Sequence, residues 1–241
     1  MATNAGVRLT LDRLRHRQVR WQRLYFDRFA VRYAVSGRGP AVVLPKKDLP
    51  TYLPDSALAD RYTFVQIEPL GFCRSDRPPP YELSVADQVL TVCDAAGIDD
   101  FAIWGYSQGG AMACTVARAS SRVRALVCGG FNVLRDPGTA WLARANRQRR
   151  IPESARAFWN DFSRFDWHHE LKHLGIPKLM YFGTVDPHRL RRPDVPVVQG
   201  VGVDVLPFEG LGHADLGLSD ETSARAVARW LDGNYRAHRT G

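Results

Sequence analysis

The sequence predicts an α/β fold: a doubly wound, mostly parallel eight-stranded sheet with helices on both faces. Short apolar runs alternate with amphipathic segments along most of the chain, as in parallel strands joined by helical crossovers. The clearest junction is Gly105-Tyr106-Ser107-Gln108-Gly109, where an apolar strand at 101–104 turns directly into a helix rich in small residues. We expect residues 1–241 to form a single domain, because 241 residues can bury a full core without splitting.

Each expected strand is an apolar run bounded by turn residues. After an N-terminal arm of about 18 residues, the strands are expected at 19–25, 29–35, 41–44, 63–67, 101–104, 124–129, 178–182 and 201–207. Helices are expected at 55–61, 84–96, 108–119, 168–174 and 219–234. The helix at 84–96 has the clearest bounds, because Ser84 and Asp87 have capping-box spacing and Gly97 follows it.

The alternation stops between residues 131 and 166, and we expect a short helical lid inserted there. The segment holds several aromatic residues beside an arginine-rich run. Trp141, Trp159 and Phe162 are its candidate substrate contacts. Two interpretations stay open: these aromatics line a substrate pocket, or they attach the lid to the core.

Ser107 is the candidate nucleophile. It stands in a G-x-S-x-G sequence at a strand-to-helix turn, where glycines permit a tight backbone and the helix N-terminus favours developing negative charge. The short motif alone arises easily by chance, so its flanks carry the prediction. Gln108 follows the nucleophile and offers its backbone N–H to an oxyanion, and Tyr106 is a candidate substrate contact.

A serine hydroxyl needs a base to take its proton and an acid to orient that base. Asp186 follows the expected strand 178–182, and His213 follows the expected strand 201–207. The chain order Ser, Asp, His is that of nucleophile-elbow enzymes. Asp161 and Asp215 are fallback acids, because neither follows a strand in the expected place.

From about residue 20 to its end, the chain resembles the α/β-hydrolase-fold superfamily, in its compact form with a serine nucleophile. Besides the elbow, residues 70–78 resemble the family's loop after an early strand, 176–186 its acid segment and 211–213 its histidine loop. The resemblance implies the fold and the roles of Ser107, Asp186 and His213. It is less specific for the reaction, because the fold hosts esterases, thioesterases, lactonases, peroxidases, C–C hydrolases and non-hydrolytic enzymes.

The chain departs from the family at the loop after strand 41–44. There the family has His-Gly, whose next backbone N–H supplies half of the oxyanion hole, whereas this chain has Pro45-Lys46-Lys47. We expect the second oxyanion donor to be the N–H of Lys47 or a lysine side chain, with Lys46 contacting substrate. Either the backbone still donates, or the site serves an anionic substrate or chemistry that needs no ordinary oxyanion hole.

The sequence therefore predicts a serine hydrolase that cleaves a small or medium ester, thioester or lactone through an acyl-enzyme, without cofactor or metal. One alternative is an enzyme of the same scaffold that performs cyclisation, C–C cleavage or another lyase-like step on a specialised metabolite. Another is a non-catalytic small-molecule binder.

We expect a small-molecule substrate as the partner, and the composition gives no sign of a membrane or nucleic-acid partner. Hydrophobic residues at 45% and charged residues at 24% are ordinary globular values. With no apolar signal region and no run of 18 apolar residues, we expect a cytoplasmic protein without a membrane partner. The net charge of +8 comes mostly from arginine without a nucleic-acid motif, so we expect solvated surface and no nucleic acid. The H-E-x-x-H match at 169–173 has no convincing third ligand, so we expect no zinc.

Overall fold

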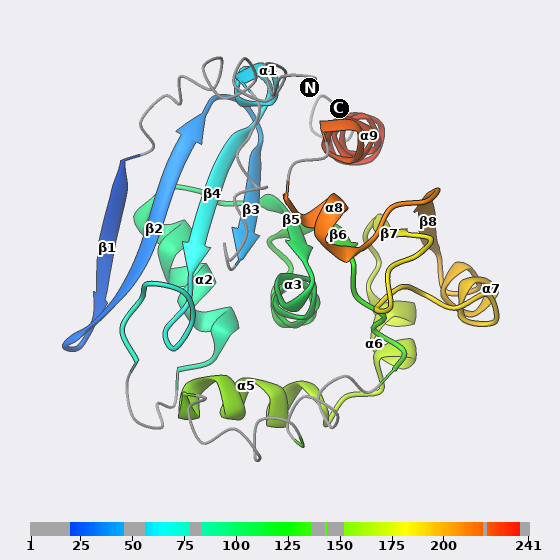
Figure 1. Cartoon of the computed structure of the whole chain (residues 1–241). Helices are drawn as coiled ribbons and strands as arrows, with labels where there is room; N and C mark the ends of the chain where they lie inside the picture. Colours follow the sequence, from blue (N-terminus) through cyan, green and yellow to red (C-terminus); the bar gives the residue numbers. More distant parts are fainter. Residues whose placement is uncertain are drawn as a thin grey trace, which may run out of the picture.

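A computed structural model describes residues 20–45, 56–77, 83–135, 143, 152–218 and 221–236. Its centre is an eight-stranded sheet in the order β1-β2-β4-β3-β5-β6-β7-β8, which runs from left to right in Figure 1. β1 and β4 pair antiparallel with β2, and the other neighbouring strands are parallel. The predicted α/β class with a mostly parallel eight-stranded sheet is confirmed. The strands are β1 (Trp21–Phe26), β2 (Phe29–Gly37), β3 (Ala41–Pro45), β4 (Thr63–Glu68), β5 (Phe101–Tyr106), β6 (Val123–Gly129), β7 (Lys178–Gly183) and β8 (Val203–Phe208).

The central strands are apolar on both faces. Every residue of β3, β5 and β7 is buried, which is the pattern of a parallel sheet covered on both sides. The strand ends lie within two residues of those predicted, and the start of β8 moves from 201 to 203. This strand begins at Val203 because Gly202 occupies a turn, with φ of +74° and its N–H donating to the Gln199 carbonyl at 2.9 Å.

Helices contribute buried side chains to a separate core on each face of the sheet. One core includes residues of α2 (Val85–Ala95), α3 (Gln108–Ala119), α5 (Glu153–Phe162), α6 (Trp167–His173) and α7 (Asp194–Gln199). The other includes residues of α1 (Ser56–Ala59), α8 (His213–Leu218) and α9 (Glu221–Leu231), which continues as a π-helical turn over Asp232–Arg236. Among the described residues, no helix is long and apolar enough to cross a membrane.

The helix starting at Ser84 has the predicted capping box: the Asp87 N–H donates to Ser84 Oγ at 3.1 Å, and the Ser84 N–H donates to the Asp87 carboxylate at 3.2 Å. Two helices are corrections, since α7 and α8 were not predicted, whereas α5 lies in the segment expected to hold a short helical lid. In particular, the residues after β8 form a helix that starts at His213, before the helix that was expected from 219. Residues 219 and 220 lie outside the described part of the chain. Within the described part, α9 begins at Glu221.

The described part of segment 131–166 packs on the core through aromatic side chains. Phe158 lies edge-on to Phe72 at a centroid distance of 6.0 Å, and Phe131 lies 5.7 Å from Phe162. Trp159 and Phe162 are 3% and 1% exposed, so their described contacts attach α5 to the body of the fold. The boundaries of a lid within one domain stay a prediction.

Candidate active site

The turn between β5 and α3 holds Ser107 in a strained conformation. Its φ is +53° and its ψ is −124°, a backbone conformation that costs a non-glycine residue about 1–3 kcal/mol. The Ser107 N–H donates to the Gly129 carbonyl at 2.8 Å, which fixes the turn to the neighbouring strand. A β-carbon on Gly105 would lie 1.9 Å from the Gly109 carbonyl oxygen, so only glycine lets strand and helix approach this closely.

Asp186 lies in the turn after β7 and is fully buried. Its N–H donates to the Gly183 carbonyl at 3.0 Å, and its own carbonyl accepts from the Arg189 N–H at 3.2 Å. One carboxylate oxygen, Oδ1, accepts the His188 N–H at 2.7 Å. The turn therefore fixes the carboxylate and leaves Oδ2 for a further partner.

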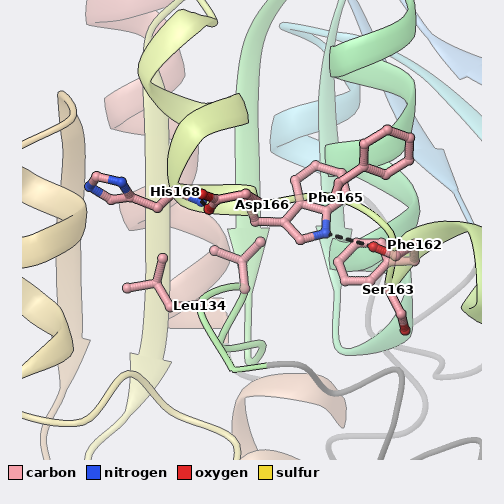
Figure 2. A pocket seen from close by; sticks show the side chains of 8 residues that line it. Leu134, Phe162, Ser163, Phe165, Asp166 and His168 are labelled. Carbon is pink, nitrogen blue, oxygen red and sulfur yellow. Dashed lines mark hydrogen bonds between the residues drawn. The ribbon is translucent and has the colours of Figure 1, made fainter.

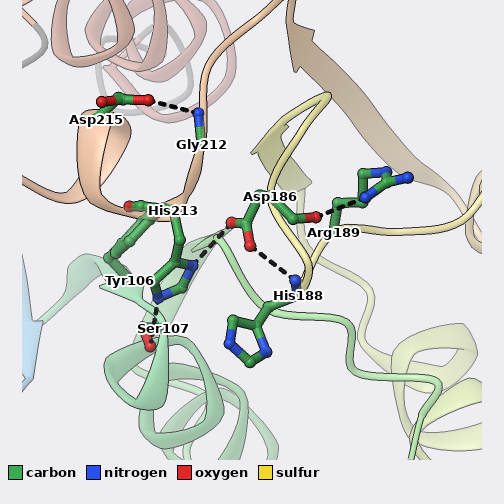
Figure 3. Close-up of polar contacts among 8 residues, drawn as sticks. All are labelled: Tyr106, Ser107, Asp186, His188, Arg189, Gly212, His213 and Asp215. Atoms are coloured by element: carbon green, nitrogen blue, oxygen red, sulfur yellow. Dashed lines mark hydrogen bonds and ion pairs between the residues drawn. The ribbon is translucent and has the colours of Figure 1, made fainter.

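His213 supplies that partner. Its Nδ1 lies 2.8 Å from Asp186 Oδ2, and its Nε2 lies 3.0 Å from Ser107 Oγ (Figure 3). The imidazole thus bridges serine and carboxylate, one nitrogen to each. The structure brings together all three residues that the sequence predicted as a catalytic set, from positions after β5, β7 and β8.

Neither of the two fallback acids takes the place of Asp186. Asp215 Oδ2 accepts the Gly212 N–H at 2.7 Å and holds the turn that leads into α8. Asp161 lies on α5, whose buried side chains belong to the core that also includes residues of α2, α3, α6 and α7. Among the described residues, Asp186 is the carboxylate within hydrogen-bond distance of His213.

Tyr106 lies against His213 instead of facing an open pocket. Its hydroxyl donates to the His213 carbonyl at 2.8 Å, and the two rings lie 5.1 Å apart, centroid to centroid. The side chain is 4% exposed, and burial, followed by the negative charge of Asp186, raises the pKa of the phenol. Its predicted contact with substrate stays a prediction, whereas its support of the histidine was not foreseen.

The structure describes one of the two predicted oxyanion donors. Gln108 is the first residue of α3, so its N–H has no acceptor within the helix and points from a helix N-terminus. Lys46, a predicted substrate contact, and Lys47, the predicted second donor, lie outside the described residues, and so does Trp141. Their roles stay predictions.

Phe162 borders a hollow of about 230 Å³ (Figure 2). Ser107, Asp186 and His213 do not line this hollow. The predicted pocket aromatic therefore faces a space separate from the serine, and Trp159 is buried beside it. The lining residues are Val133, Leu134, Phe162, Ser163, Phe165, Asp166, Trp167 and His168.

The H-E-x-x-H helix shows an internal contact between its histidines. The rings of His169 and His173 lie 4.1 Å apart, and His173 Nδ1 lies 2.8 Å from the His169 carbonyl oxygen. In the described part of the chain, no group of three or more His, Cys, Asp or Glu residues could hold a metal ion.

One more residue lies beside this set, although the sequence favours a surface position for it. His188 lies two residues after Asp186, and its ring stands edge-on to the His213 ring at a centroid distance of 4.8 Å. Its position directly behind the acid was the available signal, but a sequence position does not show which way a ring points.

Solved structures share this fold. E-2-(acetamidomethylene)succinate hydrolase is 16% identical over 89% of this chain and 100% of its own, with a TM-score of 0.69. A membrane phospholipase A, a bacterial virulence factor, is 19% identical over 89% of this chain and 86% of its own, with a TM-score of 0.67. The enol-lactonase from Burkholderia xenovorans LB400 is 15% identical over 87% and 98%, with a TM-score of 0.64.

These identities show a common fold and no more. No curated protein matches the sequence. A sequence model described as alpha/beta hydrolase fold matches residues 46–179, more than half of the chain and including the Ser107 turn. Together with the strand order and the elbow, this match shows that the chain belongs to the α/β hydrolase fold family.

Proposed function

We propose that the protein is a serine hydrolase that cleaves small or medium esters, thioesters or lactones through an acyl-enzyme. The observation that carries the proposal is the continuous chain of contacts from Ser107 Oγ through the His213 ring to Asp186. A serine hydroxyl becomes a useful nucleophile when a base can take its proton and an acid orients the base. This arrangement meets both needs.

In the proposed mechanism, Ser107 Oγ attacks the substrate carbonyl while His213 Nε2 takes the hydroxyl proton. The buried carboxylate of Asp186 holds the imidazole through Nδ1 and stabilises its cation. The Gln108 N–H stabilises the tetrahedral oxyanion, and a second donor comes from the Lys46–Lys47 loop. Each donor of this kind contributes roughly 100- to 1000-fold in rate.

Breakdown of the tetrahedral intermediate reverses the proton transfer. The imidazolium of His213 gives its proton to the leaving oxygen or sulfur, and the acyl group stays on Ser107. Water then attacks the acyl-enzyme with His213 again acting as base, which releases the acid and restores the serine.

Family membership supports acyl transfer, and the names of the similar structures agree with it. A hydrolase, a phospholipase and an enol-lactonase are among the proteins that share the fold. Because fold does not determine reaction, the proposal depends on the residues of the site.

Labelling with a fluorophosphonate probe, mapped by mass spectrometry, tests the nucleophile. We expect an adduct on Ser107 in the wild type and none in Ser107→Ala. Ser120→Ala is the matched control, since Ser120 caps the far end of α3 and accepts the Arg122 N–H at 3.2 Å. An adduct in the wild type and in Ser120→Ala, but not in Ser107→Ala, supports an activated serine at position 107. A panel of esters, thioesters and lactones then defines the substrate class.

A second candidate is an enzyme of the same scaffold that performs lyase-like, cyclisation or C–C cleavage chemistry. The observation that favours it is the replacement of the family's His-Gly by Pro45-Lys46-Lys47. Absence of labelling between pH 6 and 9 would contradict the hydrolase proposal and favour this candidate. Ligand binding without any turnover would favour a binding protein.

A further inference from the structure

The backbone of His188 is fixed by the same carboxylate that holds His213. Asp186 Oδ1 accepts the His188 N–H at 2.7 Å, while Oδ2 lies 2.8 Å from His213 Nδ1. The turn closes where the Arg189 N–H donates to the Asp186 carbonyl at 3.2 Å. The buried carboxylate of Asp186 therefore contacts both residues, the backbone of His188 and the ring of His213.

The His188 ring lies beside the ring of His213, the proposed base. It stands edge-on to His213 at 4.8 Å with an interplanar angle of 66°, and Figure 3 shows it on the same side of Asp186 as Ser107. The residue is exposed, and within the described residues its ring nitrogens have no hydrogen-bond partner. A histidine ring has an N–H donor in either protonation state, so this one can donate to an acceptor on the substrate.

The loop that carries His188 is strongly basic. Its four basic side chains are those of His188, Arg189, Arg191 and Arg192. Arg189 Nη1 donates to the Asp186 carbonyl at 2.8 Å, which keeps its charge close to the site. Arg191 and Arg192 are exposed, and no carboxylate in the described part of the chain pairs with either side chain.

The carboxylates around this loop already have donors. Asp194 accepts from Asn132 Nδ2 at 2.8 Å and from the Arg191 N–H at 3.1 Å. Glu209 lies 3.2 Å from Thr184 Oγ1, and Asp215 accepts the Gly212 N–H. The side of the site formed by residues 188–192 therefore presents the exposed guanidinium groups of Arg191 and Arg192 and the unoccupied ring donor of His188.

We propose that His188 is a substrate-positioning residue and that the basic loop 188–192 makes the site prefer substrates bearing a carboxylate near the scissile bond. The inference rests on the proposed hydrolase function and names its substrate class. The His188 ring donates directly to the carboxylate, and the arginines strengthen its attraction through space. At separations of about 7 Å in a solvated site, each positive charge favours an anion roughly three- to tenfold.

Two pairs of esters test the preference. 4-Nitrophenyl hexanoate and mono(4-nitrophenyl) adipate differ by a carboxylate on the acyl side, and phenyl acetate and 4-carboxyphenyl acetate differ by one on the alcohol side. We expect the wild-type kcat/KM to be at least tenfold higher for the anionic member of one pair, after correction for the uncatalysed rates. This advantage should shrink as salt is raised, because salt screens exposed charges.

Substitutions assign the preference to the loop. His188→Phe keeps a ring beside His213 but removes the donor, so we expect the anionic advantage to fall about three- to tenfold, mainly through KM. His188→Lys restores a donor and should recover part of it, and the double change Arg191→Ala with Arg192→Ala should weaken it further. Matched controls are His169→Phe on α6 and Arg229→Ala on α9, both exposed and both expected to leave the ratio unchanged.

The outcomes separate this inference from the proposed function. Turnover with equal rates for both members of each pair overturns the inference alone, and so does an anionic advantage that His188→Phe leaves intact. No turnover of any ester, with Ser107 unlabelled by the fluorophosphonate, overturns the hydrolase proposal and the inference with it.

Discussion

The hydroxyl of Tyr106 donates a hydrogen bond to the carbonyl oxygen of His213 at 2.8 Å. Tyr106, directly before the proposed nucleophile, therefore holds the backbone of His213, the proposed base. Tyr106 and His213 lie 107 positions apart in the sequence. The rings also pack against each other. Strand β5 thus positions both partners of the proton transfer, Ser107 by its turn and His213 by this contact.

Replacing Tyr106 with Phe should slow the chemistry without unfolding the protein. The ring keeps its packing, but the His213 carbonyl loses a donor worth about 1 kcal/mol. We expect fluorophosphonate labelling of Ser107 to slow roughly fivefold. Tyr33→Phe is the matched control, since Tyr33 is also buried and donates to Gln22 Oε1 at 3.1 Å on β1. Equal labelling rates in the two variants would show that the hydrogen bond does not position the base.

The identity of the acid can be tested by two isosteric changes. Asp186→Asn removes the charge that orients His213 and stabilises its cation, and we expect labelling and ester turnover to fall about 100- to 10,000-fold. Asp215→Asn keeps an oxygen acceptor for the Gly212 N–H, so we expect a change below about threefold. Turnover and labelling of both purified variants measure the contrast. A larger loss in Asp215→Asn would make Asp215 the acid.

Much of the sheet could be predicted because strand signals are local. The apolar runs of β5 and β7 are bounded by turn residues, so their bounds differ from the expected ones only by the last residues. The strand order could not be obtained in this way. β4 lies between β2 and β3, a neighbour relation that long-range packing decides.

The missed helices, α7 and α8, and the exact bounds of α5 lack clear local signals in the sequence. The start of α5 has no side-chain cap after Pro152, so its bounds were not clear from the sequence. Its buried residues Ala155, Phe158, Trp159 and Phe162 do have helical spacing. α7 contains Pro196, and α8 is only six residues long and contains a glycine. Helices of this length are stable through tertiary contacts and not through propensity.

The three residues of the proposed catalytic set could be predicted because each has a characteristic place just after a strand. Ser107, Asp186 and His213 each follow a strand, and parallel strands bring their carboxyl ends to one edge. The contacts of Tyr106 and His188 with His213 depend on ring directions, which no spacing reports. The lysine loop and Trp141 lie outside the described residues, so their predicted roles remain to be tested.

The tightness of the elbow gives a direct prediction about Gly105. Gly105→Ala would place a β-carbon 1.9 Å from the backbone oxygen of Gly109, where only backbone movement could relieve the clash. We expect a loss of more than about 3 kcal/mol in the free energy of unfolding, measured in urea, together with loss of labelling at Ser107. Gly175→Ala is the control, because its β-carbon would meet nothing within 4 Å. Similar stability of the two variants would contradict the packing at the turn.

The stability of the fold at alkaline pH gives another test, because burial raises the pKa of two phenols and a thiol. Tyr62 is fully buried and donates to Asp232 Oδ1 at 2.7 Å; burial, reinforced by the Asp232 carboxylate, raises its pKa. Burial likewise raises the pKa of the Tyr106 phenol, and it raises the pKa of the Cys93 thiol to about 12. Burial lowers the pKa of Lys178, which has the opposite effect on the pH dependence.

The sign follows from proton binding. A group whose pKa is raised by folding stabilises the protein below its unfolded pKa, and this contribution is lost as pH rises towards the folded pKa. Each such group lowers the free energy of unfolding by about 1.4 kcal/mol per pH unit in that window. Lys178 adds stability with rising pH and offsets Cys93, but the unfolded-state ionisation of Tyr62 and Tyr106 outweighs it, so we expect net destabilisation above about pH 10.

Replacing Tyr62 with Phe should therefore weaken the loss of stability at alkaline pH. The variant should be less stable than the wild type at pH 8 by about 1 kcal/mol, because it lacks the hydrogen bond to Asp232. Between pH 10 and 11, its free energy of unfolding should fall by about 1 kcal/mol less than that of the wild type, since the unfolded chain no longer has this phenol to ionise. Urea unfolding at each pH measures both effects. Tyr25→Phe is the control, because Tyr25 is 59% exposed; identical slopes in the two variants would show that the Tyr62 phenol does not hold its proton on folding.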